Sequence, residues 1–276
     1  KHMTRNYSNW PIILVLLLIS APIIVMYAFL LIDTVTTSPP GSAIPNGFTL
    51  SHWRFLIDPT ATGDVWGPTL TTILFTASIV LIVLGVSSTA GYALSRLNMP
   101  FRRFFLGGIL VMHAFPLVTL IIGVFLVLQF VGLYNTLTGV VLVKAGLMLP
   151  FGIWIMKGFY DTVPWEIEMA GVQDGASRFT VWRRLILPQV KPGLFALALF
   201  AAIDAWGEYM LPRILAPSAD FEVLSIYLNT VSDPDSTTYN FNLFKSVGLF
   251  YTLPILALYA IFRDRLMNIF GRGTKG

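Results

Sequence analysis

The chain has 276 residues, of which 55% are hydrophobic and only 12% are charged, and its formal net charge is +4. Soluble domains carry about a quarter of charged residues, so this composition indicates a membrane protein. The chain has no cysteine, which excludes disulfides, thiolate chemistry and cysteine-ligated metals. Residues 1–9 are interpreted as a cloning remnant, Lys1-His2, followed by a short N-terminal segment that starts at Met3.

Six apolar segments have the length needed to cross a hydrocarbon core of about 30 Å. The first is too long and too unlike a cleavage site to be a removed signal peptide. Pro22 inside it predicts a kink rather than a break. We therefore expect an all-α integral membrane protein, with a six-helix transmembrane domain at 10–262 and a tail at 263–276. The spans are expected at residues 10–32, 69–94, 105–128, 139–160, 193–215 and 246–262.

The distribution of lysine and arginine gives the direction of these spans, because cytoplasmic connections are enriched in both residues. One set of connections holds most of them, and the opposite set holds most of the acids. Both termini are therefore expected in the cytoplasm, and the basic excess is a topology signal rather than a nucleic-acid-binding patch. Lys144, near the outer start of the fourth span, is expected to extend toward the membrane surface. The cytoplasmic set comprises Arg5, Arg96, Arg102, Arg103, Lys157, Arg178, Arg183, Arg184, Lys191, Arg263, Arg265, Arg272 and Lys275.

The outer connections at 33–68 and 216–244 are long, and residues 129–138 predict a tight uncharged turn. Within the first, the segment "FTLSHWRFLID" predicts a short helix on the outer surface, because its apolar residues recur at helical spacing. No connection is long enough for a soluble domain of ordinary size.

A polar segment at 161–192 interrupts the apolar sequence on the cytoplasmic side. Pro164 predicts a helix start, with Glu166 and Glu168 in the favourable first turn. The pair Asp174-Gly175 predicts its end, since glycine suits the left-handed conformation found there. A second helix is expected to end before Pro188. This helix–turn–helix element has two interpretations, a linker whose basic residues meet lipid headgroups or a docking element for a cytoplasmic partner.

The segments "EIEMAGVQDGAS" and "LILPQVKPG" resemble the EAA loop of ABC importer permeases. The sequence departs from the family pattern at Met169, which stands where the family has glutamate. The residue before it, Glu168, is an acid. The segments "AGYALSRLNMPFRR", "GLYNTLTGVVL" and "LPFGIWIMKGFYDTVP" resemble the carbohydrate, MalG-like subfamily. The residues that match the loop pattern are Asp174, Gly175, Ala176, Leu187, Pro188 and Pro192.

This resemblance implies a type I ABC importer permease fold in the bacterial cytoplasmic (inner) membrane. The implied partners are a second, different (MalF-like) permease, two ATPase subunits, an extracytoplasmic solute-binding protein and a carbohydrate substrate. ATP and Mg²⁺ would be bound by the ATPase subunits. The terminal "GRGTKG" lacks the spacing of a phosphate-binding loop, so the chain is expected to be a permease without its own ATPase site. The resemblance places ATPase coupling at Glu168, Ala170, Gly171, Asp174, Gly175 and Ala176.

Polar residues inside the predicted spans are candidates for the substrate pathway, because acids at that depth are costly unless they face a cavity or a partner. Asp204 and Glu208 lie one helical turn apart. They could accept hydrogen bonds from sugar hydroxyls, with Trp206 or Tyr209 stacking on the ring, or pair with a basic group of the second permease. His113 could line the same path or bond to a neighbouring helix. No arrangement of these residues predicts catalysis or a metal site.

Two other functions remain open at this stage. A permease for glycerol-phosphate-type cargo is the first, although no basic residue is expected at the membrane centre to favour an anion. A secondary carrier or channel is the second, and it would show internal repeats and broken helices at the midplane. We find no inverted repeat in the sequence.

Overall fold

The structure, a computed structural model, describes residues 10–37, 45–60, 63–98, 100–235 and 240–271. Inside helices, the side chains of Leu110, His113, Leu117 and residues 263–271 are not described. The predicted N-terminal remnant at 1–9 and the last part of the predicted tail, 272–276, lie outside the described residues. The regular secondary structure of the described residues is helical, apart from an isolated β-bridge between Thr36 and Phe48.

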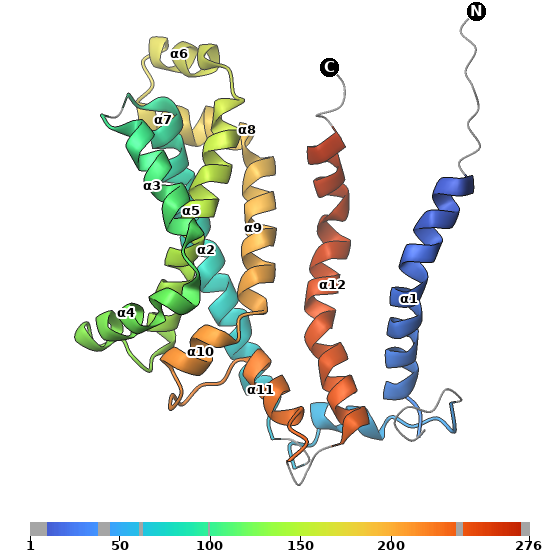
Figure 1. Ribbon diagram of the computed structural model, residues 1–276. Helices are drawn as coiled ribbons and strands as arrows, with labels where there is room; N and C mark the ends of the chain where they lie inside the picture. The colour runs from blue at the N-terminus through green and yellow to red at the C-terminus, as the bar shows by residue number, and fades with distance from the viewer. Residues whose placement is uncertain (1–9, 38–44, 61–62, 99, 236–239, 272–276) are drawn as a thin grey trace, which may run out of the picture. The chain divides into compact units, whose positions relative to one another are not determined.

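Four described helices are long and apolar enough to cross a membrane (Figure 1). They confirm four of the six predicted spans. The chain forms two compact units, Lys1–Val65 with Leu228–Leu253 and Trp66–Tyr227 with Pro254–Gly276, which we call unit 1 and unit 2. The four helices are α1 (Trp10–Thr34), α2 (Trp66–Arg96), α5 (Leu137–Asp161) and the segment Phe241–Phe262 of α12 (Phe241–Gly271).

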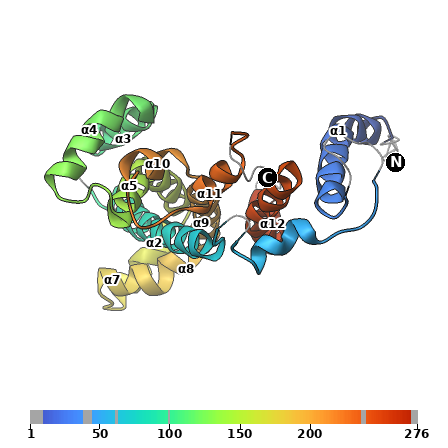
Figure 2. The same ribbon diagram turned by 90° about the horizontal axis from the view of Figure 1, so that it is seen from below.

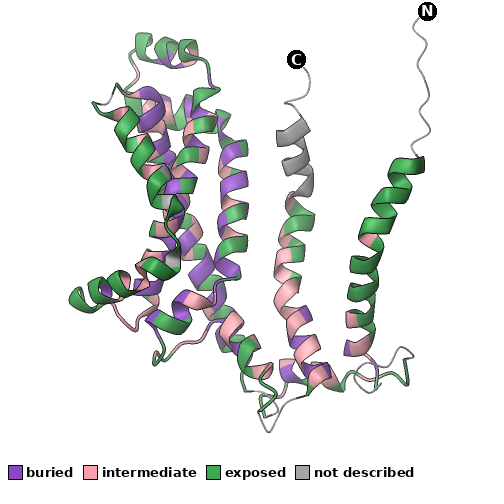
Figure 3. Ribbon diagram, viewed as in Figure 1, coloured by how far each residue is buried: buried purple, intermediate pink, exposed green. Residues whose placement is uncertain are grey.

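Unit 1 contains α1 and the first part of α12. The helix α1 is continuous through Pro22, as expected where lipid forces the backbone to keep its own hydrogen bonds. Its apolar residues are exposed all round (Figure 3). A helix that is hydrophobic on every side is typical of a membrane span.

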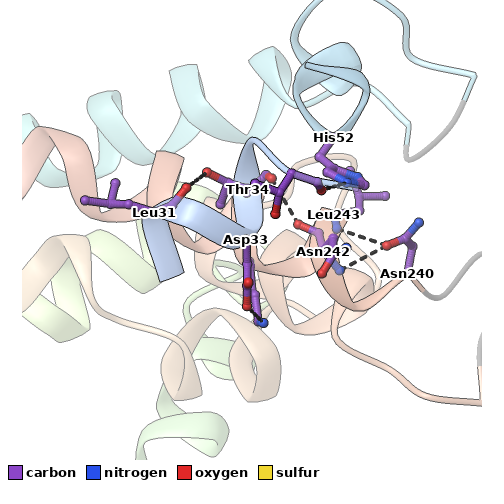
Figure 4. A network of polar contacts seen from close by, with 10 residues as sticks. Leu31, Asp33, Thr34, His52, Asn240, Asn242 and Leu243 are labelled. Atoms are coloured by element: carbon purple, nitrogen blue, oxygen red, sulfur yellow. Dashed lines mark hydrogen bonds and ion pairs between the residues drawn. The ribbon is translucent and has the colours of Figure 1, made fainter. Parts of the chain in front are cut away.

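Polar contacts join the end of α1 to the start of α12 within unit 1 (Figure 4). Asp33 and Lys245 form an ion pair whose side chains are each 15% exposed. The Asn240 side chain caps α12, since its Oδ1 accepts from the backbone N–H groups of Asn242 and Leu243 at 3.0 and 3.2 Å. The predicted outer helix is present as a short 3₁₀ helix, η1 (Ser51–Leu56).

The core of unit 2 is formed by α2, α5 and α9 (Lys191–Trp206), which pack against one another (Figures 1 and 2). Glycine allows the close approach of α2 to α5. A Cβ added at Gly91 would lie 2.8 Å from Met156 Cβ, and one added at Gly152 would collide with Ser87 Oγ. The large side chains buried between these helices include Phe75, Ile79, Val83, Met156, Tyr160 and Leu197.

The third and fifth predicted spans are not single straight helices, which corrects the sequence prediction. The third divides into α3 (Arg102–Ala114) and α4 (Leu117–Phe130), because Pro116 places Phe115 in the extended conformation with ψ 126°. In the fifth, α9 ends at Trp206 and a separate short helix α10 (Met210–Leu215) follows, before α11 (Leu224–Val231).

Candidate functional site

The polar segment between α5 and α9 folds as the predicted helix–turn–helix. Its first helix, α6 (Trp165–Gln173), starts after Pro164 and carries both acids in its first turn. The turn contains Gly175 at φ +80°, the left-handed conformation that favours glycine. Ser177 then caps the second helix, since its Oγ accepts from the Thr180 N–H at 3.3 Å.

The second helix continues through Pro188, contrary to the prediction that it ends before this residue. It consists of α7 (Arg178–Val181), a π-helical turn η2 (Trp182–Ile186) and α8 (Leu187–Gln189). The backbone N–H of Leu187 donates to the carbonyl of Trp182, five residues earlier. This wider turn shifts the hydrogen-bonding pattern by one residue just before Pro188, which has no N–H to donate.

The two sides of α6 have different environments. Glu168 and Gly171 are buried, whereas Met169 and Ala170 are exposed. A Cβ added at Gly171 would lie 2.7 Å from Leu185 Cδ1, so the glycine lets α6 pack on the second helix. Among the other residues that the resemblance assigns to coupling, Asp174 and Gly175 are exposed and Ala176 is half-buried.

Glu168 contacts the end of α2 rather than solvent. The Tyr92 hydroxyl donates to Glu168 Oε1 at 2.7 Å, and Arg96 Nε lies 3.5 Å from Glu168 Oε2. Nearby, Trp182 Nε1 donates to the Tyr160 hydroxyl at 3.1 Å. Buried polar and aromatic contacts therefore attach the helix–turn–helix to the ends of α2 and α5.

At the other end of unit 2, Lys144 binds both predicted pathway acids. Its Nζ lies 2.6 Å from Glu208 Oε2 and 2.9 Å from Asp204 Oδ2. The expectation that Lys144 extends to the membrane surface is wrong, because its side chain is 10% exposed and ion-paired. Glu208 Oε1 also accepts from the Leu211 N–H at 3.0 Å, at the start of α10. We call Lys144, Asp204 and Glu208 the charge triad.

The charge triad borders a hollow of about 430 Å³, a size within the range of small-molecule sites. Lys144 and Asp204 supply its charged groups, and the Asp204 side chain is 55% exposed. Phe151 and Phe200 form an edge-to-face pair with ring centroids 6.2 Å apart. Aromatic walls beside a carboxylate and an ammonium suit a ligand that has apolar faces and hydroxyl groups. The lining residues are Met112, Phe115, Lys144, Leu147, Met148, Phe151, Phe200 and Asp204.

The remaining predicted pathway residues take other positions. Trp206 is buried at 5% exposure and does not line the hollow, and neither does the half-buried Tyr209. His113 lies in α3, and its side chain falls outside the described residues. In the described part of the chain, no group of three or more His, Asp and Glu side chains could hold a metal ion.

Sequence reasoning missed Lys144 and the three phenylalanines as members of this site. Lysine near the end of a span is usually a surface residue, and its partners lie 60 or more residues further along the chain. The sequence held one signal for Phe115. It precedes a proline, and the residue before a proline disfavours the helical conformation, so a break in the membrane helix could have been predicted there.

Four apolar helices of spanning length, with an exposed helix–turn–helix between α5 and α9, define a helical membrane protein. The family described as "Binding-protein-dependent transport system inner membrane component" matches residues 82–276, and the chain belongs to this family. This confirms the family inferred from the EAA-like loop and the assignment of the chain as a permease rather than an enzyme.

Similar proteins cover most of the chain. The trehalose transport system permease protein SugB of Mycobacterium tuberculosis is 25% identical over 267 residues, covering 95% of this chain and 95% of that protein. The maltose/maltodextrin transport system permease protein MalG of Salmonella typhimurium is 25% identical over 253 residues, covering 86% of this chain and 84% of that protein.

A solved structure has the same fold over nearly the whole chain. It is a chain from the crystal structure of a bacterial ABC transporter involved in the import of the acidic polysaccharide alginate. The TM-score is 0.79 at 20% identity, and the match covers 96% of this chain and 99% of that chain. At this identity the likeness establishes the fold and not the cargo.

Proposed function

We propose that this chain is the permease subunit of an ATP-driven ABC importer for a carbohydrate, either a sugar or an oligosaccharide. The observation that carries the proposal is the α6–α8 element, which presents an exposed helical face while its inner face is attached to α2 and α5. An ATPase that drives transport must bind a rigid element of the permease that is continuous with the membrane helices, because its movement has to reach those helices. The names of two relatives give trehalose and maltose as their substrates, which supports a carbohydrate as the cargo of this chain.

The working assembly contains more than this chain. A second, different (MalF-like) permease forms the other half of the pathway. Two ATPase subunits bind ATP and Mg²⁺ and dock on the exposed face of α6, and an extracytoplasmic solute-binding protein delivers the sugar. Asp174, Gly175 and Ala176 lie at the tip of the docking element, and Ala170 on its exposed face permits close seating.

The proposed topology has six crossings of the bacterial inner membrane, with both termini in the cytoplasm. In unit 2, Arg96 at the end of α2 donates to the Tyr160 carbonyl near the end of α5 at 2.9 Å, so these two ends lie on one side. The chain must therefore cross the bilayer between them, and α3 and α4 together form this broken crossing. In unit 1, the Asp33–Lys245 pair places the end of α1 beside the start of α12. This arrangement agrees with the proposed outer side for the connections at 33–68 and 216–244.

The hollow beside the charge triad is the proposed part of the substrate pathway. Asp204 accepts hydrogen bonds from sugar hydroxyls, and the apolar face of a sugar ring packs on Phe151 and Phe200. The triad holds two carboxylates against one ammonium, so it carries a net negative charge when all three groups are ionised. This charge disfavours a phosphate-bearing cargo and argues against the glycerol-phosphate alternative.

Purification of the assembled importer tests the proposal. The tagged chain is coexpressed with its candidate second permease, ATPase and binding protein, and ATP hydrolysis is measured in lipid nanodiscs with trehalose, maltotriose or glycerol 3-phosphate. We expect the ATPase to copurify and a neutral sugar to stimulate hydrolysis when the binding protein is present. A chain that purifies without any ATPase, or stimulation by glycerol 3-phosphate alone, would contradict the proposal.

A further inference from the structure

The acid nearest the family's glutamate position faces into the permease. Glu168 is 4% exposed, and its two oxygens contact Tyr92 and Arg96 on α2. Met169, the next residue and about 100° further around the same helix, is 45% exposed. A charged contact from Glu168 to a docked ATPase would require α6 to rotate and would leave Arg96 without its carboxylate.

Arg96 joins three helices at this point. Besides Glu168 on α6, it donates from Nη2 to the carbonyls of Tyr160 and Val163, near the end of α5. Its guanidinium also lies 4.9 Å from the ring centroid of Trp165, the first residue of α6. We call Tyr92, Arg96 and Glu168, with the two carbonyls, the Glu168 cluster.

The physical properties of this cluster favour a fixed geometry. The Arg96 and Glu168 side chains are 2% and 5% exposed, so water does not screen their attraction. A buried ion pair adds little net stability over an apolar pair of the same size, but loss of one partner is costly. Arginine in such a cluster offers several donors in one rigid plane. The cluster therefore favours the orientation of α6 against α2 and α5 that the structure shows.

The cluster also lies on a direct route between the two ends of unit 2. The helices that it joins to α6 are α2 and α5, and α5 carries Lys144 of the charge triad. The helices α2 and α5 pack closely at Gly91 and Gly152, which leaves little room for one helix to move past the other. The cluster therefore connects α6 to the helix that lines the hollow.

We propose that Glu168 is a positioning residue that fixes the docking helix α6 to α2 and α5, and not a contact to the ATPase. The inference rests on the proposed function. In this proposal, an ion pair inside the permease couples ATP hydrolysis to transport. The ATPase docks on the exposed side of α6, where Met169 lies.

The first test measures the position of α6 directly. The chain has no cysteine, so two introduced cysteines give unique spin-label sites. Gln173→Cys on α6 and Thr89→Cys on α2 are both exposed positions. We expect a single narrow label-to-label distance in the otherwise unaltered chain and a broadened one with Glu168→Gln. Glu166→Gln, an exposed acid on the same helix, is the control and should keep the narrow distance.

The second test measures coupling in the assembled importer. With Glu168→Gln the ATPase should still copurify, while ATP hydrolysed per sugar transported rises by about fivefold or more, the lower end of typical coupling between sites. Tyr92→Phe, which removes one hydrogen bond and no charge, should give a smaller rise. Asp235→Asn, an acid-to-amide change at an exposed residue of unit 1, should leave the ratio unchanged.

Other outcomes separate this inference from the proposed function. Loss of the ATPase with Glu168→Gln while the label distance stays narrow would make Glu168 a docking contact and overturn the inference. A broadened distance with unchanged coupling would also overturn it, because α6 would then need no fixed attachment. Failure of the unaltered chain to copurify an ATPase would refute the proposed function, and the spin-label result would still report whether the cluster holds α6.

Discussion

Lys144 Nζ on α5 lies 2.6 Å from Glu208 Oε2, just beyond the end of α9. The side chains of both residues are at most 10% exposed, and the more exposed Asp204 completes the triad at 2.9 Å. The pair joins two helices that approach each other at the hollow. Glu208 is buried and Lys144 is the cation that contacts it, so the buried carboxylate depends on Lys144, whereas Lys144 also contacts the exposed Asp204.

Removal of Lys144 alone should destabilise the chain. Lys144→Met leaves Glu208 buried without its cation, which typically costs about 3–5 kcal/mol. The double variant Lys144→Met/Glu208→Gln removes both charges and should recover most of the loss. The measurement is the thermal unfolding temperature of the purified chain in detergent. A Lys144→Met variant as stable as the unaltered chain would show that Glu208 is not buried in the way the structure describes.

Asp204 should matter for transport more than for stability. Its side chain is 55% exposed, so Asp204→Asn leaves Lys144 paired to Glu208 and should lower the unfolding free energy by about 1 kcal/mol or less. Sugar uptake should fall severalfold, because an amide accepts weaker hydrogen bonds than a carboxylate. Uptake in proteoliposomes, normalised to the amount of assembled complex, gives the comparison. Normal uptake by Asp204→Asn would exclude this carboxylate from the pathway.

The parts of the fold that sequence predicts well are those fixed by local pattern. Apolar runs gave α1, α2, α5 and α12, and the Asp174-Gly175 pair gave the turn after α6. The ends of α1, α2 and α5 lie within three residues of the prediction, whereas α12 begins five residues earlier than predicted. Each of these features depends on neighbours in the chain, so a single sequence contains the information.

The parts that sequence did not predict depend on partners that are distant in the chain. The side of α6 on which Glu168 lies is set by Tyr92 and Arg96, more than 70 residues earlier. Lys144 is an ordinary surface lysine by pattern and a buried triad member only because α9 ends beside it. Long-range pairing of charges leaves no periodic signal in one sequence.

Close packing of α5 on α2 should be sensitive to single methyl groups. Gly152→Ala places a Cβ against Ser87 and Val83, and overpacking of this kind costs about 1–3 kcal/mol. Gly146→Ala on the same helix meets no atom within 4 Å and should be neutral or slightly stabilising, because alanine favours the helix. Denaturation of the two purified variants in the same detergent makes the comparison. Equal stability would mean that α2 and α5 are not in contact at Gly152.

The turn at Gly175 offers a way to separate folding of the docking element from its use. Gly175 has φ +80° and would meet no atom within 4 Å if a Cβ were added, so a substitution costs backbone strain but no steric clash within the chain. The strain should be about 1 kcal/mol for phenylalanine and less for asparagine, which adopts positive φ more readily. Gly175→Asn should therefore keep the ATPase bound, whereas Gly175→Phe should lose it by obstructing the partner's surface. ATPase copurification and sugar-stimulated hydrolysis are compared for the two variants, with chain stability as the control. Full stimulated hydrolysis by Gly175→Phe would mean that the ATPase does not seat on this turn.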